Sequence, residues 1–286
     1  MRWDRSRASD NVEDRRGQGG GMRLGGRSIG LGTVVIAVVA MLLGVDPSVV
    51  LNLAGGLNGP TAQQQSAPPP PAEDKAARFV SHVLGDTEDT WRTLFAKSGK
   101  TYEDPKLVLF SGSTDTACGL GQSASGPFYC PGDHKVYLDL TFFHELGNRF
   151  GAPGDFAQAY VIAHEVGHHV QSLLGISAQV QAERQRSDEV RANQLSVKLE
   201  LQADCFAGIW ANHADRARQL LEAGDIDEGL NAATAIGDDR LQKQARGHVV
   251  PDSFTHGSSA QRVRWFKRGI ESGDPAVCNT FKSTRL

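Results

Sequence analysis

The sequence predicts an α+β fold, mostly helical with a small sheet, preceded by one transmembrane helix. Three observations support this prediction. Long segments repeat apolar residues at three- and four-residue steps, which is the period of a helix. Two short runs combine the apolar and aromatic residues that are typical of strands. One uncharged apolar run of 17 residues precedes them, at the short end of the length that spans a bilayer.

The N-terminal part of the chain predicts a membrane anchor. Residues 1–27 are polar and rich in glycine and arginine, which indicates a disordered segment. The apolar run, residues 29–45, follows these arginines, so the positive-inside rule places the N-terminus in the cytoplasm and the rest of the chain in the periplasm or at the cell surface. A cleavable signal peptide is the alternative, but no small-x-small site follows. We therefore predict an anchor region over residues 28–57 and a proline- and glutamine-rich linker over residues 58–72.

The folded domain is expected over residues 73–286. The hydrophobic content of the chain, 40%, is enough for a core, and its net charge of -3 gives no reason to expect nucleic acid as a partner. The predicted elements, in order, are a helix over 73–97, strands over 107–110 and 135–140, a helix over 156–174, a helix from about 188 to 213, and a helical remainder broken at Pro251 and Gly257.

Four cysteines are consistent with a location outside the cytoplasm. Cys118 and Cys130 bracket a loop rich in glycine and serine, and a disulfide closing such a loop stabilises a fold by about 3 kcal/mol. Cys205 and Cys278 are the remaining pair, although four cysteines permit three pairings. Buried free thiols are the alternative. A zinc site made from these cysteines is not expected, because no Cys-x-x-Cys spacing occurs.

Two histidines and a glutamate in the predicted helix over 156–174 have the spacing of a metal site. His164, Glu165 and His168 form the pattern His-Glu-x-x-His. Residues four apart lie on one face of a helix, so both imidazoles can reach one ion, and the glutamate can take a proton from a water molecule that the metal activates. Structural histidines in a buried helix are the alternative. His169 lies outside the pattern, and we expect a structural or surface role for it.

A third ligand is expected on the next long helix, because catalytic zinc normally takes three protein ligands. Glu200 and Asp204 are four residues apart in a strongly apolar segment, and a buried pair of carboxylates is costly unless cations or donors meet it. Zinc would meet Glu200, and the N–H of a ligating imidazole would meet Asp204. Salt bridges to arginines such as Arg191 or Arg216 are the alternative.

These motifs resemble a bacterial family of neutral zinc metallopeptidases. The resemblance rests on AHEVGHHVQ and ELQADCFAG, with support from RWDRSRASDNVEDRRG, GPFYCPGDHKVYLDL and IGDDRLQ. A wider similarity is to thermolysin-like and Ste24-like peptidases, in which Glu-x-x-x-Asp supplies the third ligand and a supporting carboxylate. The resemblance implies a zincin-like metallopeptidase domain with one catalytic zinc ion on His164, His168 and Glu200. It also implies that Asp204 accepts a hydrogen bond from His164, and it implies a peptide or protein substrate without identifying it.

A second stretch near the C-terminus is similar to the Ste24-like enzymes. Thr255-His256, followed by Arg262, matches their Thr-His-Pro…Arg pattern, but this chain has Gly257 in place of the proline. His256 or Arg262 could stabilise the oxyanion of a reaction intermediate. A helix-capping loop with a solvated arginine is the alternative.

The reaction that these residues predict is hydrolysis of peptide bonds, with Glu165 as general base. In zincin folds an edge strand pairs with extended substrate, so the resemblance implies that the predicted strand over 135–140 is this sheet edge; an ordinary sheet strand is the alternative. A rival function is a membrane-tethered, zinc-stabilised binding or chaperone module without turnover, against which the intact Glu165 argues. A second rival is a structural domain without metal.

Overall fold

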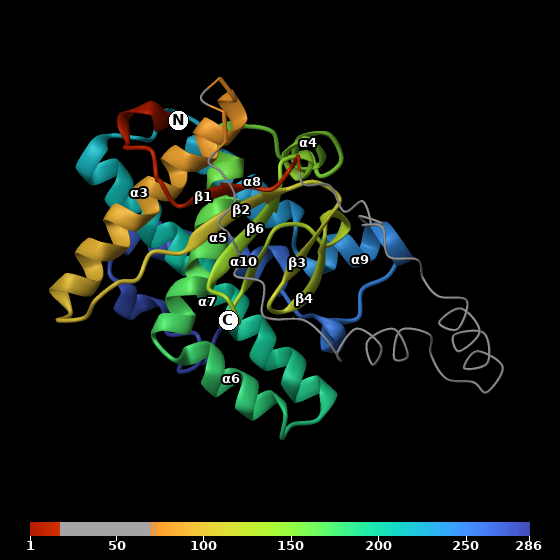
Figure 1. The fold of residues 1–286 in the computed structure, drawn as a ribbon. Coiled ribbons are helices and arrows are strands. Elements are labelled where there is room, and N and C mark those ends of the chain that lie inside the picture. Colours follow the sequence, from red (N-terminus) through yellow and green to blue (C-terminus); the bar gives the residue numbers. More distant parts are fainter. Residues whose placement is uncertain (18–69, 72) are drawn as a thin grey trace, which may run out of the picture. The chain divides into compact units, whose positions relative to one another are not determined.

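The computed structural model describes residues 1–17, 70–71 and 73–286 (Figure 1). Helices dominate and the strands form a small sheet, which confirms the predicted α+β architecture. The helices are α3 (Lys75–Lys97), α4 (Thr141–Asn148), α5 (Asp155–Leu173), α6 (Ile176–Arg184), α7 (Glu189–Arg218), α8 (Asp225–Ala235), α9 (Asp238–Arg246) and α10 (Ser259–Ser272), with 3-10 turns η1 (Trp3–Arg5), η2 (Ser123–Ser125), η3 (Pro251–Ser253) and η4 (Pro275–Cys278).

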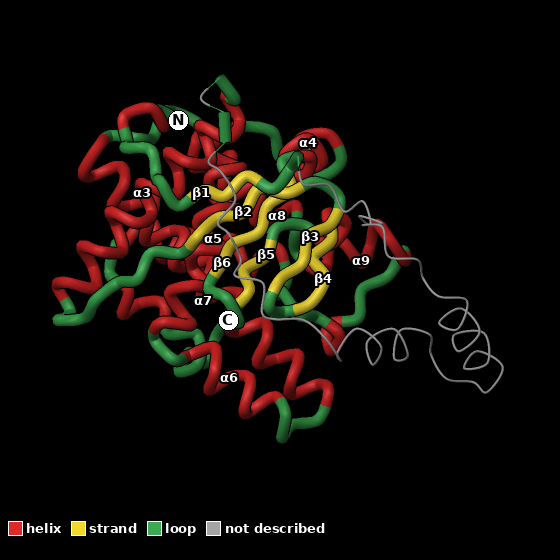
Figure 2. The backbone as a smooth tube through the Cα atoms, viewed as in Figure 1, coloured by secondary structure: helices red, strands yellow, loops and turns green. Residues whose placement is uncertain are grey.

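The main sheet has four strands in the order β1-β2-β6-β5 (Figure 2). The strands are β1 (Val12–Asp14), β2 (Lys106–Phe110), β5 (Phe128–Cys130) and β6 (Lys135–Asp139), and a separate hairpin is formed by β3 (Ser113–Thr116) and β4 (Gly119–Gln122). The first three strands in that order are parallel, and β5 is antiparallel to β6. The prediction that residues 135–140 form the sheet edge is wrong, because β6 pairs with β2 on one side and with β5 on the other. The antiparallel edge strand is β5.

The helices α5, α7 and α10 form the centre of the core. Glycines at the contact allow α7 and α10 to pack closely. On α10, a methyl group added at Gly269 would lie 2.1 Å from the carbonyl oxygen of Cys205 on α7, and one added at Gly208 would lie 2.2 Å from that of Phe266. The two backbones therefore touch, and this contact fixes α10 against the side of α7.

The N-terminal segment belongs to the folded domain. Residues 1–17 form η1 and β1, and β1 extends the sheet beside β2. The buried carboxylate of Glu88 on α3 accepts hydrogen bonds from Ser9 (2.6 Å) and Asn11 (2.8 Å). Residues 1–17 are therefore ordered, unlike the disordered segment predicted for 1–27, because Ser9 and Asn11 bond to the buried Glu88 on α3. Residues 18–27 lie outside the described part of the chain.

The predictions about the membrane are corrected by two observations. In the described part of the chain, no helix has the length and apolar character needed to cross a bilayer. The pairing of Val12 with Leu107 places β1 and β2 in one sheet, whereas a single crossing between them would put these strands on opposite sides of a membrane. The predicted transmembrane helix and the single-pass location are therefore wrong. The anchor region predicted for residues 28–57 lies outside the described residues.

Both disulfides are present, so the alternative of free thiols is excluded for the four cysteines. The Cys118–Cys130 bond joins the turn of the β3–β4 hairpin to the end of β5. The Cys205–Cys278 bond joins the middle of α7 to η4 near the C-terminus. The second bond closes a much longer loop, with a sequence separation of 73 residues, and so restricts the unfolded chain more strongly.

Candidate metal centre

The helix α5 presents the His-Glu-x-x-His motif from inside the core. Its other residues are largely small and apolar, and almost every position from Phe156 to Gln171 is buried. His164 and His168 are one helical turn apart, and their rings lie with centroids 4.8 Å apart. Both imidazoles therefore project from one face of the helix, as their four-residue spacing predicts.

Gly167 allows α7 to approach this face. A methyl group at Gly167 would lie 3.0 Å from the carbonyl oxygen of Ala203 and 3.1 Å from its Cα. The motif thus has glycine at a position where α5 lies directly against α7. This contact brings Glu200, one turn before Asp204 on α7, opposite the two histidines.

The three candidate ligands converge at distances that fit one zinc ion. The Nε2 atom of His164 lies 3.2 Å from one carboxylate oxygen of Glu200, and the Nε2 atom of His168 lies 3.4 Å from the other. One ligand atom from each residue lies within 4.8 Å of the other two. Tetrahedral zinc with bonds near 2.0–2.1 Å separates neighbouring ligand atoms by about 3.3 Å. The set of two imidazoles and one carboxylate, with a fourth position left over, is typical of catalytic zinc.

Asp204 supports His164 from behind. The Nδ1–H of His164 donates to Asp204 over 2.8 Å, which leaves Nε2 free for a metal. The buried carboxylate of Asp204 also accepts from Tyr160 (2.5 Å) and from Arg262 (2.8 and 2.9 Å). Burial opposes ionisation of Asp204, but Arg262 and His164 outweigh it and hold its pKa well below the usual range.

Arg262 does not face the open side of the centre. Its side chain is only 3% exposed, and its donors point at Asp204, at the hydroxyl of Tyr160 and at the carbonyl oxygen of Ile236. This placement differs from the predicted contact with an oxyanion, because the sequence shows the residue but not its direction. Asp204 does form a salt bridge with an arginine, as the alternative prediction held, but that arginine is Arg262 on α10. Arg191, which that prediction named, pairs instead with Glu183.

His256 lies at the rim of the centre in a loop held by Asp238. The backbone N–H groups of Thr255, His256 and Gly257 all donate to one carboxylate oxygen of Asp238, over 2.8, 2.6 and 2.9 Å. Gly257 has φ of +93°, a conformation that proline cannot adopt. The hydrogen bond to Asp238 and the charge of Glu200 raise the pKa of His256, although burial opposes them.

Comparison with known proteins places the chain in a family. A family model with the description "Putative neutral zinc metallopeptidase" matches residues 1–281. The chain belongs to this family of zinc metallopeptidases. It is 55% identical over 290 residues to the uncharacterized protein YpfJ of Escherichia coli (strain K12), covering 98% of this chain and 99% of that protein. It is 41% identical over 258 residues to the uncharacterized protein Rv2575 of Mycobacterium tuberculosis, covering 86% of each. None of the solved structures matches it.

Glu165 has the environment that a general base in this zinc metallopeptidase family needs. Glu165 follows His164 directly on α5, so its side chain lies beside the face that carries the two imidazoles. The residue is only 8% exposed. No described side chain donates a hydrogen bond to its carboxylate, so the oxygens are free to take a proton. Burial raises the pKa of Glu165, and the neighbouring Glu200 adds to this, while His164 and His168 oppose it.

Sequence reasoning missed three polar residues around the centre. Two of them have a helical spacing that could have revealed them: Tyr160 lies four positions before His164, and Gln171 lies three positions after His168. Gln202, two positions before Asp204, has no such signal. Gln171 and Gln202 are almost fully buried. His169, in contrast, has the structural role that was expected. Burial lowers its pKa to about 4, and its ring nitrogens contact the Glu103 carbonyl (2.7 Å) and the Tyr129 hydroxyl (3.1 Å).

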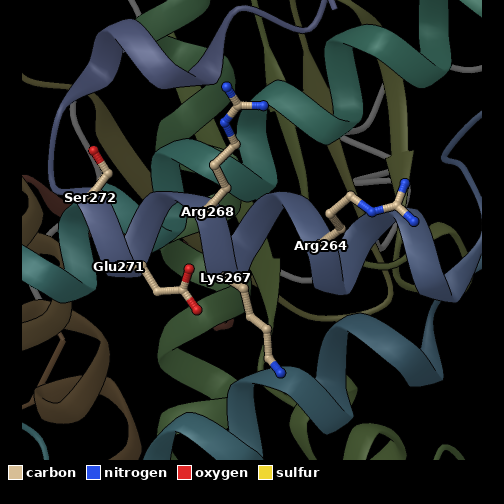
Figure 3. Close-up of a pocket in the computed structure, with 5 residues that line it drawn as sticks. All are labelled: Arg264, Lys267, Arg268, Glu271 and Ser272. Atoms are coloured by element: carbon tan, nitrogen blue, oxygen red, sulfur yellow. The ribbon is translucent and has the colours of Figure 1, made fainter. Parts of the chain in front are cut away.

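A surface pocket lies apart from these residues, on the outer face of α10 (Figure 3). It is lined by Arg264, Lys267, Arg268, Glu271 and Ser272. None of the predicted site residues lines it. Arg262, on the same helix, is directed to Asp204 on the buried face.

Zinc binding at pH 7 is expected to release protons. Burial opposes protonation of His164, but Asp204 and Glu200 outweigh it and raise its pKa to about 10. Glu200 likewise raises the pKa of His168 against burial. The metal-free centre therefore holds a protonated His164 at neutral pH, whereas zinc takes the neutral form, so the affinity should rise with pH. Calorimetry in two buffers of different ionisation enthalpy should give at least about one proton per zinc ion, and release of none would contradict this.

Proposed function

We propose that the protein is a zinc-dependent peptidase that hydrolyses peptide bonds. His164, His168 and Glu200 hold the ion, and Glu165 is the general base. The observation that carries the proposal is the convergence of these three donors beside a buried carboxylate without a hydrogen-bond donor of its own. Burying such a carboxylate costs stability. A pure binding module has no use for it, and this favours catalysis.

The reaction follows from the position of Glu165. When bound, zinc activates a water molecule and polarises the substrate carbonyl. Glu165 accepts a proton from the attacking water and later gives it to the leaving amine. Its raised pKa suits both tasks, because a group with a pKa nearer to neutral both takes and releases a proton.

Two further groups support the reaction. Asp204, held by Tyr160 and Arg262, keeps His164 in the orientation that directs Nε2 to the metal. His256 is the candidate for stabilising the oxyanion. Its side chain is 52% exposed, and the pKa raised by Asp238 favours its charged form near neutral pH.

The substrate backbone is proposed to pair with β5. This strand is at the sheet edge and antiparallel to its neighbour. Tyr129 on β5 is hydrogen-bonded to His169 on α5. Because His169 adjoins the candidate ligand His168, this bond holds the sheet edge close to the metal centre. Pairing through backbone hydrogen bonds accepts many sequences, so the expected substrate is an extended peptide segment.

A cleavage assay tests the proposal. The zinc-loaded protein is incubated with a library of quenched fluorescent peptides and with unfolded proteins. We expect cleavage that a chelator abolishes and added zinc restores. A protein that binds zinc stoichiometrically but cleaves nothing in the library would support the rival function of a binding module.

A further inference from the structure

His168 is supported by an amide, whereas His164 is supported by a carboxylate. The Nδ1 atom of His168 lies 2.9 Å from Oε1 of Gln171. When Nε2 of His168, which faces Glu200, is the metal ligand, the proton of the neutral ring is on Nδ1 and is donated to Oε1 of Gln171. The neutral amide adds no charge, so it can fix the direction of the ring without raising its basicity as Asp204 does for His164.

Gln171 also connects the two helices that carry the ligands. Its Nε2 atom donates to the carbonyl oxygen of Leu199 (2.7 Å) and to the side-chain oxygen of Gln202 (3.1 Å). Leu199 directly precedes Glu200 on α7. Both N–H bonds of the buried amide are thereby used, and their directions leave only the oxygen of Gln171 to face His168.

The chain of amides ends at the second disulfide. The Nε2 atom of Gln202 donates to the carbonyl oxygen of Cys278 over 3.0 Å. Cys278 is fully buried and bonded to Cys205, three positions after Gln202 on α7. The hydroxyl of Thr280 donates to the carbonyl oxygen of Lys198 (2.7 Å) and fixes the same segment a second time.

We propose that Gln171 and Gln202, anchored by the Cys205–Cys278 disulfide, are positioning residues that direct His168 to the metal. Donors and acceptors follow one another in a single order from His168 to Cys278, and each amide is buried. Zinc affinity is then coupled to the disulfide. The proposal rests on the ligand set of the proposed function, but not on turnover.

Substitution at Gln171 separates positioning from simple packing. Gln171→Leu removes the acceptor for His168, and zinc affinity should fall by about 10- to 100-fold. Gln171→Glu keeps an acceptor for His168, but it replaces the donating amide nitrogen by an oxygen that faces the oxygens of Leu199 and Gln202. It should lower the melting temperature of the metal-free protein at least as much as Gln171→Leu, yet keep zinc affinity within about threefold of wild type.

Affinity is measured with zinc chloride in competition with a chromophoric chelator. If affinity follows the melting temperature in both variants, or if Gln171→Leu binds zinc as wild type does, the positioning role is wrong. Absence of zinc binding by the wild-type protein would instead contradict the proposed function, so the two failures are distinguishable.

The two disulfides provide a matched pair for the second part of the proposal. Replacing Cys205 and Cys278 by serine should lower zinc affinity by about 10-fold. Replacing Cys118 and Cys130, whose bond lies at the β3–β4 hairpin, should leave it unchanged. Equal effects of the two double variants would overturn the coupling between this disulfide and the metal centre. The Gln171 variants keep the inference testable if the first double variant does not fold.

Discussion

The Glu165→Gln variant is expected to bind zinc as the wild-type protein does and to lose about 10³-fold in the rate of peptide hydrolysis. The amide has the shape of the carboxylate but cannot accept the proton of the attacking water. Glu165 is not one of the three converging donors, so the ligand set stays intact. Elemental analysis gives zinc content, and the initial rate of peptide cleavage gives activity.

The stability of the same variant has a defined sign. Burial raises the pKa of Glu165 in the folded state above its unfolded value. As pH rises above about 4.3, the unfolded state therefore ionises first, and the folded state loses stability relative to it. Replacing the carboxylate by an amide removes this loss, and the metal-free variant should melt no lower than wild type at pH 7. Glu145→Gln is the matched control, since Glu145 is exposed on α4 in a His-Glu pair without a second histidine. Turnover of Glu165→Gln at the wild-type rate would disprove the assignment of the base.

The sequence predicted the long helices better than the strands. The helices around Trp91, His164 and Glu200 all have regular apolar spacing over several turns, and they lie close to the predicted positions. The strands β1 and β5 have three residues each, too few for an alternation to be visible. Composition misled the prediction for the N-terminal segment, because it does not distinguish an arginine that pairs with a buried acid from a solvated one. Arg7, for example, contacts the buried Glu88.

The candidate centre was predictable as far as spacing along one helix determines it. A four-residue step places His164 and His168 on one face whatever the rest of the fold does. The distance between that face and Glu200 depends on how closely α5 and α7 pack, which Gly167 decides and which no spacing shows. The direction of Arg262 likewise depends on the contact of α10 with α7, a tertiary feature that the sequence does not reveal.

Glu200→Ala is expected to abolish stoichiometric zinc binding, with an affinity loss greater than about 100-fold, because loss of a residue that only supports a ligand already costs up to that much. Two imidazoles remain, and the charge that neutralises the ion is gone. The change should also lower the pKa of His168, whose elevation depends on Glu200, so the variant should release fewer protons with any zinc it takes. Dialysis against a zinc buffer followed by elemental analysis measures occupancy.

Glu183→Ala is the matched control for this prediction. Glu183 is an exposed acid on α6 that pairs with Arg191, so its removal should leave zinc occupancy unchanged. Full occupancy in Glu200→Ala would place the third ligand elsewhere. Together with Glu165→Gln, this variant separates the two tasks of the acidic residues: one should lose metal and turnover together, and the other should lose turnover alone. If zinc served only to stabilise the chain, Glu200→Ala would still lose zinc, but Glu165→Gln would keep both zinc and function.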